Sequence, residues 1–206
     1  MILHTIQVGM TQTNCYIVGC EEAREGVVID PGGHPQRIIR QIEESGLSIQ
    51  YVLNTHCHFD HMGANAEIVE ATGAPLALHP AERPLLEVRG GAALFGLSVS
   101  ESPPPDMELA DGQTLEAGTL RFQVLHTPGH SPGGLTFYLA EEGVAFDGDL
   151  LFAMGVGRTD LHGGDRDALI RSIRDVIFKL PDETVIYPGH GPKTTVGQEK
   201  RSNPWI

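Results

Sequence analysis

Short apolar runs alternate along the chain with stretches of helical periodicity. Runs of β-branched and other apolar residues predict strands at 14–19, 26–29, 51–53, 120–125, 135–139, 144–146 and 184–187. Apolar residues that return every third or fourth position predict helices at 35–45, at 64–72 and between Asp165 and Leu180. This alternation of strands and helices is typical of the α/β class.

Two of the predicted helices carry clear boundary signals. Pro35 suits a first helical turn and Gly46 suits a helix end, which frames the helix at 35–45. Asp165 is a good N-cap for the third helix. The apolar face of that third helix consists of Leu169, Ile173, Val176, Ile177 and Leu180.

Residues 84–107 break the pattern, since they combine Gly90-Gly91, an apolar stretch at Leu94-Phe95 and three consecutive prolines at 103–105. We predict a short helix followed by a loop over the surface. The alternative is a wall or lid over a pocket, because long loops in compact domains are often functional.

Composition narrows the class of protein. A chain of 206 residues is expected to form one domain, 1–206. Lys and Arg total 14 and Asp and Glu total 27, and the net charge of −13 disfavours nucleic acid and anionic membranes as partners. Three cysteines without a CxxC pair predict reduced, buried thiols. No long apolar run and no signal-peptide pattern are present, so we expect a cytoplasmic protein.

Four titratable side chains gather directly after the predicted strand at 51–53. They are His56, His58, Asp60 and His61. In an extended loop His56 and His58 point the same way, while Asp60 and His61 follow after a turn and reach a second point nearby. Imidazole and carboxylate suit Zn²⁺, Fe²⁺ or Mn²⁺. Without an ion, packing these groups together would be costly, so the cluster predicts a metal site.

Three further residues follow the ends of later strands and are flanked by glycine. They are His130, Asp149 and His190. Four residues cannot complete two coordination spheres, but seven can. The sequence therefore predicts two sets of three ligands and one carboxylate that can bridge them.

These motifs resemble those of the metallo-β-lactamase superfamily. THCHFDH at 55–61 has its HxHxDH pattern, and TPGHSPGG, FDGDLLF and YPGHGP resemble its later metal motifs, in order. VIDPGG before the first helix is also typical of it. Within the superfamily the chain is most similar to the glyoxalase II (hydroxyacylglutathione hydrolase) branch, especially short bacterial members with GRTD, here 157–160. The resemblance implies an αββα sandwich, with two central sheets flanked by helices and a metal site at one edge.

The resemblance also implies roles for the metal-ligating residues. His56, His58 and His130 correspond to the ligands of a first ion, Asp60, His61 and His190 to those of a second, and Asp149 to the bridge. Two divalent ions are expected, zinc first, with iron or manganese as alternatives. Asp30 falls where the family places a supporting acid, although it could equally be a turn residue before Pro31.

The expected reaction is attack on a carbonyl carbon by a hydroxide that bridges the two ions, with Asp60 and Asp149 as catalytic residues. A thioester fits best, because a thiolate can leave without a general acid. The expected partner is thus a small thioester of the hydroxyacylglutathione type. Arg158 and His162 are candidate substrate contacts, since a guanidinium suits a carboxylate. The alternatives are an Arg158–Asp160 pair and a surface histidine.

Other functions stay open at this point. Persulfide dioxygenases resemble the chain in the same motifs and use a single iron on residues that correspond to His56, His130 and Asp149. A lactone or other ester hydrolase shares the ligand set, and a metal-binding protein without catalysis is the alternative from another class. Longer glyoxalase II enzymes add a C-terminal helical region that contacts glutathione. The segment after His190 does not resemble that region, so the identity of the thiol in the thioester stays open. The sequence also leaves open which metal binds and which oligomeric state the protein adopts.

Overall fold

The computed structural model describes residues 1–206. The chain divides into two compact units. The first unit contains residues 1–109 and 116–120, and the second contains residues 110–115 and 121–206. None of the helices combines the length and the apolar character needed to cross a bilayer.

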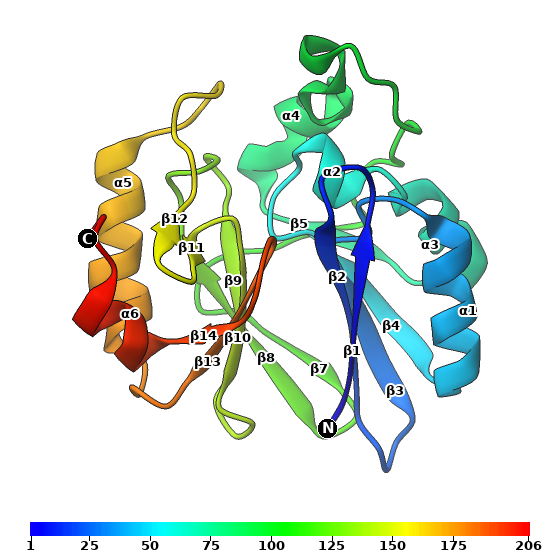
Figure 1. The fold of residues 1–206 in the computed structure, drawn as a ribbon. Helices are drawn as coiled ribbons and strands as arrows, with labels where there is room; N and C mark the ends of the chain where they lie inside the picture. The colour runs from blue at the N-terminus through cyan, green and yellow to red at the C-terminus, as the bar shows by residue number, and fades with distance from the viewer. The chain divides into compact units, whose positions relative to one another are not determined.

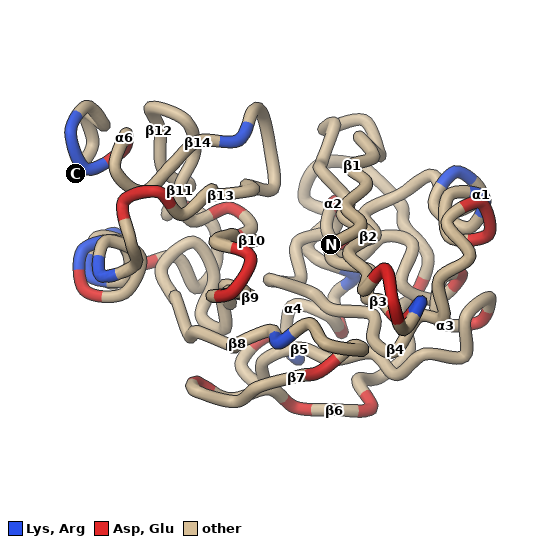
Figure 2. Tube along the Cα trace, turned by 90° about the horizontal axis from the view of Figure 1, so that it is seen from below, with Lys and Arg blue, Asp and Glu red and all other residues tan.

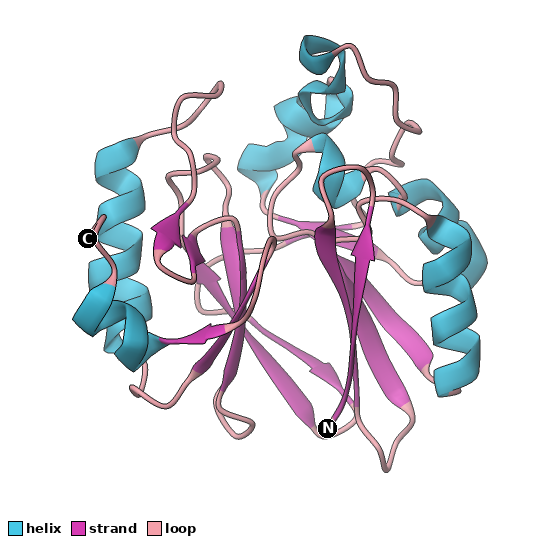
Figure 3. Cartoon of the chain, viewed as in Figure 1, coloured by secondary structure: helices cyan, strands magenta, loops and turns pink.

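A mixed six-stranded sheet forms the centre of the first unit, with strand order β1-β2-β3-β4-β5-β6. The strands are β1 (Ile2–Val8), β2 (Thr13–Gly19), β3 (Glu25–Ile29), β4 (Ser48–Leu53), β5 (Leu76–Leu78) and β6 (Met107–Glu108). The first three are antiparallel, whereas β3, β4, β5 and β6 are parallel neighbours (Figure 3). The loops that follow β3 and β4 therefore leave the sheet at the same edge.

The helices of the first unit are α1 (Pro35–Ser45), α2 (Phe59–Met62), α3 (Asn65–Thr72) and α4 (Arg83–Glu87), with 3₁₀ turns η1 (Pro80–Glu82) and η2 (Arg89–Phe95). Helices α1 and α3 lie together beside the sheet (Figure 1). Their buried residues Ile38, Ile42 and Ile68 pack into one core with Val28 and Val52 of the strands. This core holds in place the sheet edge at which the loops after β3 and β4 begin, and the loop after β4 carries the first predicted metal ligands.

A second mixed sheet forms the centre of the second unit, with strand order β14-β13-β10-β9-β8-β7. Its strands are β7 (Thr114–Ala117), β8 (Leu120–His126), β9 (Leu135–Leu139), β10 (Val144–Gly148), β13 (Val185–Pro188) and β14 (Thr194–Thr195). Strand β10 pairs antiparallel with β9 and parallel with β13. A small separate hairpin consists of β11 (Leu151–Phe152) and β12 (Gly155–Val156).

The helical segments of the second unit are α5 (Arg166–Arg171), the π turn η3 (Ser172–Val176), the 3₁₀ turn η4 (Ile177–Lys179) and α6 (Val196–Ser202). Leu169, Ile173 and Ile177 are buried against Ile186 of the sheet and Val196 of α6. Charged residues are frequent along these helices (Figure 2), and most of them are exposed, whereas Glu199 of α6 is buried.

The structure confirms the predicted start and extent of the third helix, which is not α-helical throughout. Asp165 caps α5, because its Oδ1 accepts a hydrogen bond from the Ala168 amide at 2.9 Å. Helical turns continue without a gap to Lys179, although the turn at Ser172–Val176 widens to a π turn and the last turn is 3₁₀. At the π turn the Ser172 hydroxyl donates to the Pro128 carbonyl at 2.7 Å, a contact with a distant segment that no local pattern encodes.

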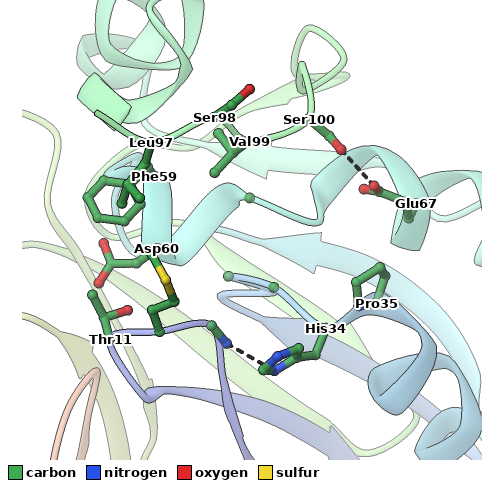
Figure 4. Close-up of a pocket in the computed structure, with 15 residues that line it drawn as sticks. Thr11, His34, Pro35, Phe59, Asp60, Glu67, Leu97, Ser98, Val99 and Ser100 are labelled. Carbon is green, nitrogen blue, oxygen red and sulfur yellow. Dashed lines mark hydrogen bonds between the residues drawn. The ribbon is translucent and has the colours of Figure 1, made fainter. Parts of the chain in front are cut away.

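Residues 84–107 contain α4 and η2, followed by a segment without regular structure. Both expectations for this stretch are met, since the irregular segment is largely exposed and part of it forms the wall of a pocket. Residues 97–100 line a pocket of about 320 Å³ in the first unit (Figure 4).

Candidate metal centre

The loop after β4 places three buried histidines side by side in the first unit. The ring centroids of His56 and His58 are 4.8 Å apart and the rings are nearly perpendicular, at 85°. The rings of His56 and His61 lie 4.0 Å apart. His61 comes within reach because α2 begins at Phe59 and turns the chain back. Asp60 lies on the same helix, and its Oδ2 accepts a hydrogen bond from the buried Thr13 hydroxyl at 3.1 Å.

Asp30 organises this cluster from the loop after β3. Its Oδ2 accepts from His61 Nδ1 at 2.9 Å and from the Thr55 hydroxyl at 2.6 Å, while Oδ1 accepts from the Thr55 amide at 2.8 Å. Asp30 also has a left-handed backbone, with φ of 53°. Asp30 therefore combines both interpretations, because its carboxylate supports His61 and its backbone forms a turn.

Glu82 supports the same loop from η1 and was not predicted. Its buried carboxylate accepts a hydrogen bond from the Cys57 amide at 2.7 Å. The Cys57 side chain points into the core of the unit. Burial, and next the carboxylates of Glu82 and Asp30, raise the pKa of the Cys57 thiol well above its usual value. The thiol therefore stays protonated at neutral pH and does not supply a nucleophile.

Two glycines allow the chain to approach this loop closely. A Cβ on Gly32 would lie 1.5 Å from the Asp60 carbonyl oxygen, and one on Gly90 would lie 2.1 Å from the Phe59 amide nitrogen. No side chain fits at either position without moving the backbone that carries Asp60 and its neighbours. The ligand loop is thus held on two sides by backbone contact.

The second unit gathers the remaining three predicted ligands at the ends of its strands. Oδ2 of Asp149 lies 3.7 Å from His130 Nε2 and 3.5 Å from His190 Nε2. His130 Nδ1 donates to the Arg158 carbonyl at 2.8 Å. One carboxylate oxygen therefore faces two imidazoles, which is the arrangement expected of a shared ligand.

The two candidate substrate residues lie differently. The Arg158 guanidinium donates two hydrogen bonds to Asp160, at 2.7 and 2.8 Å, and both side chains are more than half exposed. This pair lowers the pKa of Asp160 to about 2 and raises the pKa of Arg158. His162 is exposed in the loop before α5. Arg158 thus forms the alternative pair with Asp160, and His162 is the alternative surface histidine. A role of either residue in substrate binding stays a prediction.

The histidines are arranged to offer Nε2 to a metal ion. His61 and His130 each use Nδ1–H as a donor, to Asp30 and to the Arg158 carbonyl. The Thr55 hydroxyl gives its one proton to Asp30, so at 3.1 Å it accepts from Nδ1–H of His56. In all three rings Nε2 is then the nitrogen with a lone pair. Metal-ligating histidines are typically oriented in this way, so the residues fit divalent ions such as zinc, iron or manganese.

A profile of the Metallo-beta-lactamase superfamily matches residues 8–190. The chain belongs to the metallo-β-lactamase superfamily. This confirms the resemblance drawn from the HxHxDH and later motifs, and the matched range spans both units and all seven predicted ligands.

Curated relatives align along nearly the whole chain. The hydroxyacylglutathione hydrolase GloC of Haemophilus influenzae is 39% identical over 100% of this chain and 98% of its own. The mitochondrial persulfide dioxygenase ETHE1 of Bos taurus is 34% identical over 93% of this chain and 70% of its own. The relatives thus include both leading functions of the sequence analysis.

Solved structures confirm the metallo-β-lactamase fold. The crystal structure of the BLEG-1 B3 metallo-beta-lactamase matches with a TM-score of 0.93 and 40% identity, over 99% of each chain. The structure of TTHA1623 in a di-iron-bound form matches with a TM-score of 0.91 and 43% identity, over 98% of this chain and all of its own. TTHA1623, a related protein of the same fold, therefore binds two iron ions in that structure.

Asp30→Asn is expected to weaken metal binding about 10- to 100-fold, because supporting partners of metal-ligating histidines contribute that much to affinity. The neutral amide keeps the size of the side chain but loses the charge that His61 contacts. Competition with a chromogenic chelator would measure the change. Asp106→Asn is a matched control, since Asp106 also accepts from a backbone amide, that of Leu76. Equal affinity in the two variants would contradict the role of Asp30.

Proposed function

We propose that the protein is a dinuclear metallohydrolase that cleaves a thioester of the hydroxyacylglutathione type. His56, His58 and His130 would hold one ion, Asp60, His61 and His190 the other, and Asp149 would bridge them. The end-to-end resemblance to the hydrolase GloC carries this proposal. The seven residues are those that match the family motifs, and each unit presents its own share of them as a cluster of imidazole and carboxylate groups.

Asp149 is suited to bridging by its place between two imidazoles of its own unit. Its Oδ2 lies at nearly equal distance from His130 and His190, which the resemblance assigns to different ions. Asp60 is held by the Thr13 hydroxyl, so its carboxylate has a fixed direction. It would accept and orient a proton of the attacking water.

Bound divalent ions would supply Lewis acidity and lower the pKa of water toward neutrality. The proposal covers zinc, iron and manganese, because the donor set accepts all three. A thioester places the smallest demand on the protein, because its thiolate leaves without a proton from a general acid. The acid groups near the ligands can then all serve in metal binding and water orientation.

The decisive assay follows the thioester absorbance of S-lactoylglutathione with protein loaded in turn with zinc, iron or manganese. Loss of absorbance at a rate proportional to protein concentration is the expected result. No turnover with any of the three metals would overturn the proposal.

A second candidate is persulfide dioxygenase activity, which the bovine relative favours. It would use iron on His56, His130 and Asp149, and it would show as oxygen uptake by the iron-loaded protein with glutathione persulfide. The same preparations would be offered a lactone and a chromogenic cephalosporin, the second because of the likeness to BLEG-1. The substrate with the highest kcat/KM identifies the activity.

Arg158→Ala is expected to raise KM severalfold with a smaller change in kcat, because the guanidinium would hold the substrate rather than the transition state. Asp160→Asn is the matched variant. It weakens the two hydrogen bonds that occupy Arg158, so KM is expected to fall. Steady-state kinetics on the thioester would compare them. A loss confined to kcat in Arg158→Ala would place the residue in the chemistry instead.

A further inference from the structure

Glu199 of α6 is a buried acid that no step of the proposed reaction uses. The residue is 1% exposed. Its Oε1 accepts a hydrogen bond from the Thr194 hydroxyl. Its Oε2 accepts one from the Met154 amide and one from Nδ2 of Asn203, each at 2.9 Å. Because burying a carboxylate is costly unless it is hydrogen-bonded, these contacts hold the three donors to one place.

Two of these donors belong to segments that carry proposed metal ligands. Met154 lies at the turn of the β11–β12 hairpin, shortly after Asp149 along the chain. Thr194 lies on β14, shortly after His190. Figure 1 shows the hairpin, β14 and α6 in the second unit. One buried carboxylate therefore joins the segment after Asp149 to the segment after His190.

The turn of the hairpin is held by polar contacts more than by apolar burial. Met154 is 46% exposed and has a left-handed backbone, with φ of 62°, which is uncommon for a residue other than glycine. A second contact from α6's end supports the same turn, because Nδ2 of Asn203 also donates to the Gly155 carbonyl at 3.0 Å. Hydrogen bonds to Glu199 and Asn203 thus determine where the turn lies.

The two joined segments meet again at the ligands. The rings of Phe152 and His190 are 6.3 Å apart and steeply inclined, at 70°. The Gly189 amide donates to the Gly148 carbonyl at 2.6 Å, and Oδ2 of Asp149 lies 3.5 Å from His190 Nε2. A metal site requires its ligand distances to be correct within about 0.2 Å. A small shift of the hairpin relative to β14 would therefore be felt at this pair of ligands.

We propose that Glu199 is a positioning residue of the metal centre. It sets the spacing of Asp149 and His190, and through this spacing the affinity for the ion that the proposed function assigns to His190. The other ion takes no ligand from the segment after His190, so it should depend on Glu199 less. The inference rests on the two-ion part of the proposed function and is independent of the substrate.

Thr194→Val is the mildest test, because it removes the bond between Glu199 and β14 with little change of shape. The zinc ion at His190 is expected to bind about tenfold weaker or more, as when a supporting partner of a ligand is lost. Competition with a chromogenic chelator would measure both zinc affinities, and His190→Ala would mark the binding step that belongs to this ion. Thr184→Val is the matched control, since Thr184 is also buried in the second unit and its hydroxyl has no hydrogen-bond partner.

Two exchanges of Glu199 itself separate positioning from stability. In Glu199→Gln the amide oxygen can accept from Met154 and Asn203 while the NH₂ group donates to the Thr194 hydroxyl, so both zinc ions should be retained. Glu199→Met keeps the length but loses the acceptors, and it is expected to weaken the ion at His190 at least as much as Thr194→Val does. A purely structural contribution would lower the free energy of unfolding of the metal-free protein without changing the ratio of the two zinc affinities.

Three results would overturn the inference. They are an unchanged ratio of the two affinities in Thr194→Val, equal weakening of both ions, and the same loss in Glu199→Gln as in Glu199→Met. Wild-type protein that binds only one zinc ion would contradict the two-ion part of the proposed function and this inference with it. Two zinc ions without thioester hydrolysis would contradict the proposed activity alone, because the affinities of the variants still decide the role of Glu199.

Discussion

Replacing Asp149 by alanine is expected to remove bound metal from both sites and to lower hydrolysis about 100-fold or more. The oxygen Oδ2 faces His130 and His190 at 3.7 and 3.5 Å, so one carboxylate is in place to serve two ions. Loss of a supporting partner of a ligand typically costs 10- to 100-fold, and loss of a shared ligand should cost more. The Asp149→Ala variant should therefore lose more than one bound ion per chain.

Metal content of the purified variant, measured by plasma mass spectrometry alongside the thioester assay, would check this. Asp175→Ala is the control, since Asp175 is an exposed acid of the same unit, on the π turn that follows α5. It should retain both ions and full activity. If Asp149→Ala keeps two ions per chain, Asp149 does not bridge. If it keeps one, Asp149 is a ligand of a single ion.

Local sequence signals predicted the elements whose boundaries depend on near neighbours. Helix α1 begins at Pro35 and ends before Gly46, which has φ of 64°, as the boundary signals indicated. The crowding of His56, His58 and His61 also follows from their spacing, because an extended loop and one helical turn suffice to bring three rings together. Such features need only a few consecutive residues to specify them.

Features that depend on contacts between distant segments could not be predicted from local sequence signals. Glu82 contacts the Cys57 amide across 25 positions of sequence, and nothing near Glu82 marks it as a support of the ligand loop. Asp30 could be placed only by resemblance, since its contact with His61 arises from two loops at one sheet edge. The π turn in the third helix likewise begins at Ser172, whose hydroxyl donates to the carbonyl of the distant Pro128. In each case, tertiary contact decides what the local pattern leaves open.

Gly157 is the position where a single methyl group is expected to disturb the second unit most. A Cβ there would lie 1.8 Å from the Asp149 carbonyl oxygen and 3.3 Å from the Cβ of His130. The Gly157 amide also donates to the Leu150 carbonyl at 3.1 Å, which holds the two segments together. Since the clash is with backbone, no rotamer change relieves it, and the segment that carries Asp149 must move.

Gly157→Ala is therefore expected to lower the free energy of unfolding by about 3 kcal/mol, at the upper end of the usual range for overpacking. It should also lower metal content, because the displaced residue is the proposed bridge. Gly155→Ala adds the same methyl group two positions earlier, where the nearest atom is 3.6 Å away, and its stability should change by about 0.5 kcal/mol or less. Urea unfolding and metal analysis of both variants would compare them. Because the two glycines differ chiefly in what a Cβ would contact, equal stability and equal metal content would show that the close approach of residue 157 to Asp149 is not needed to hold the ligand.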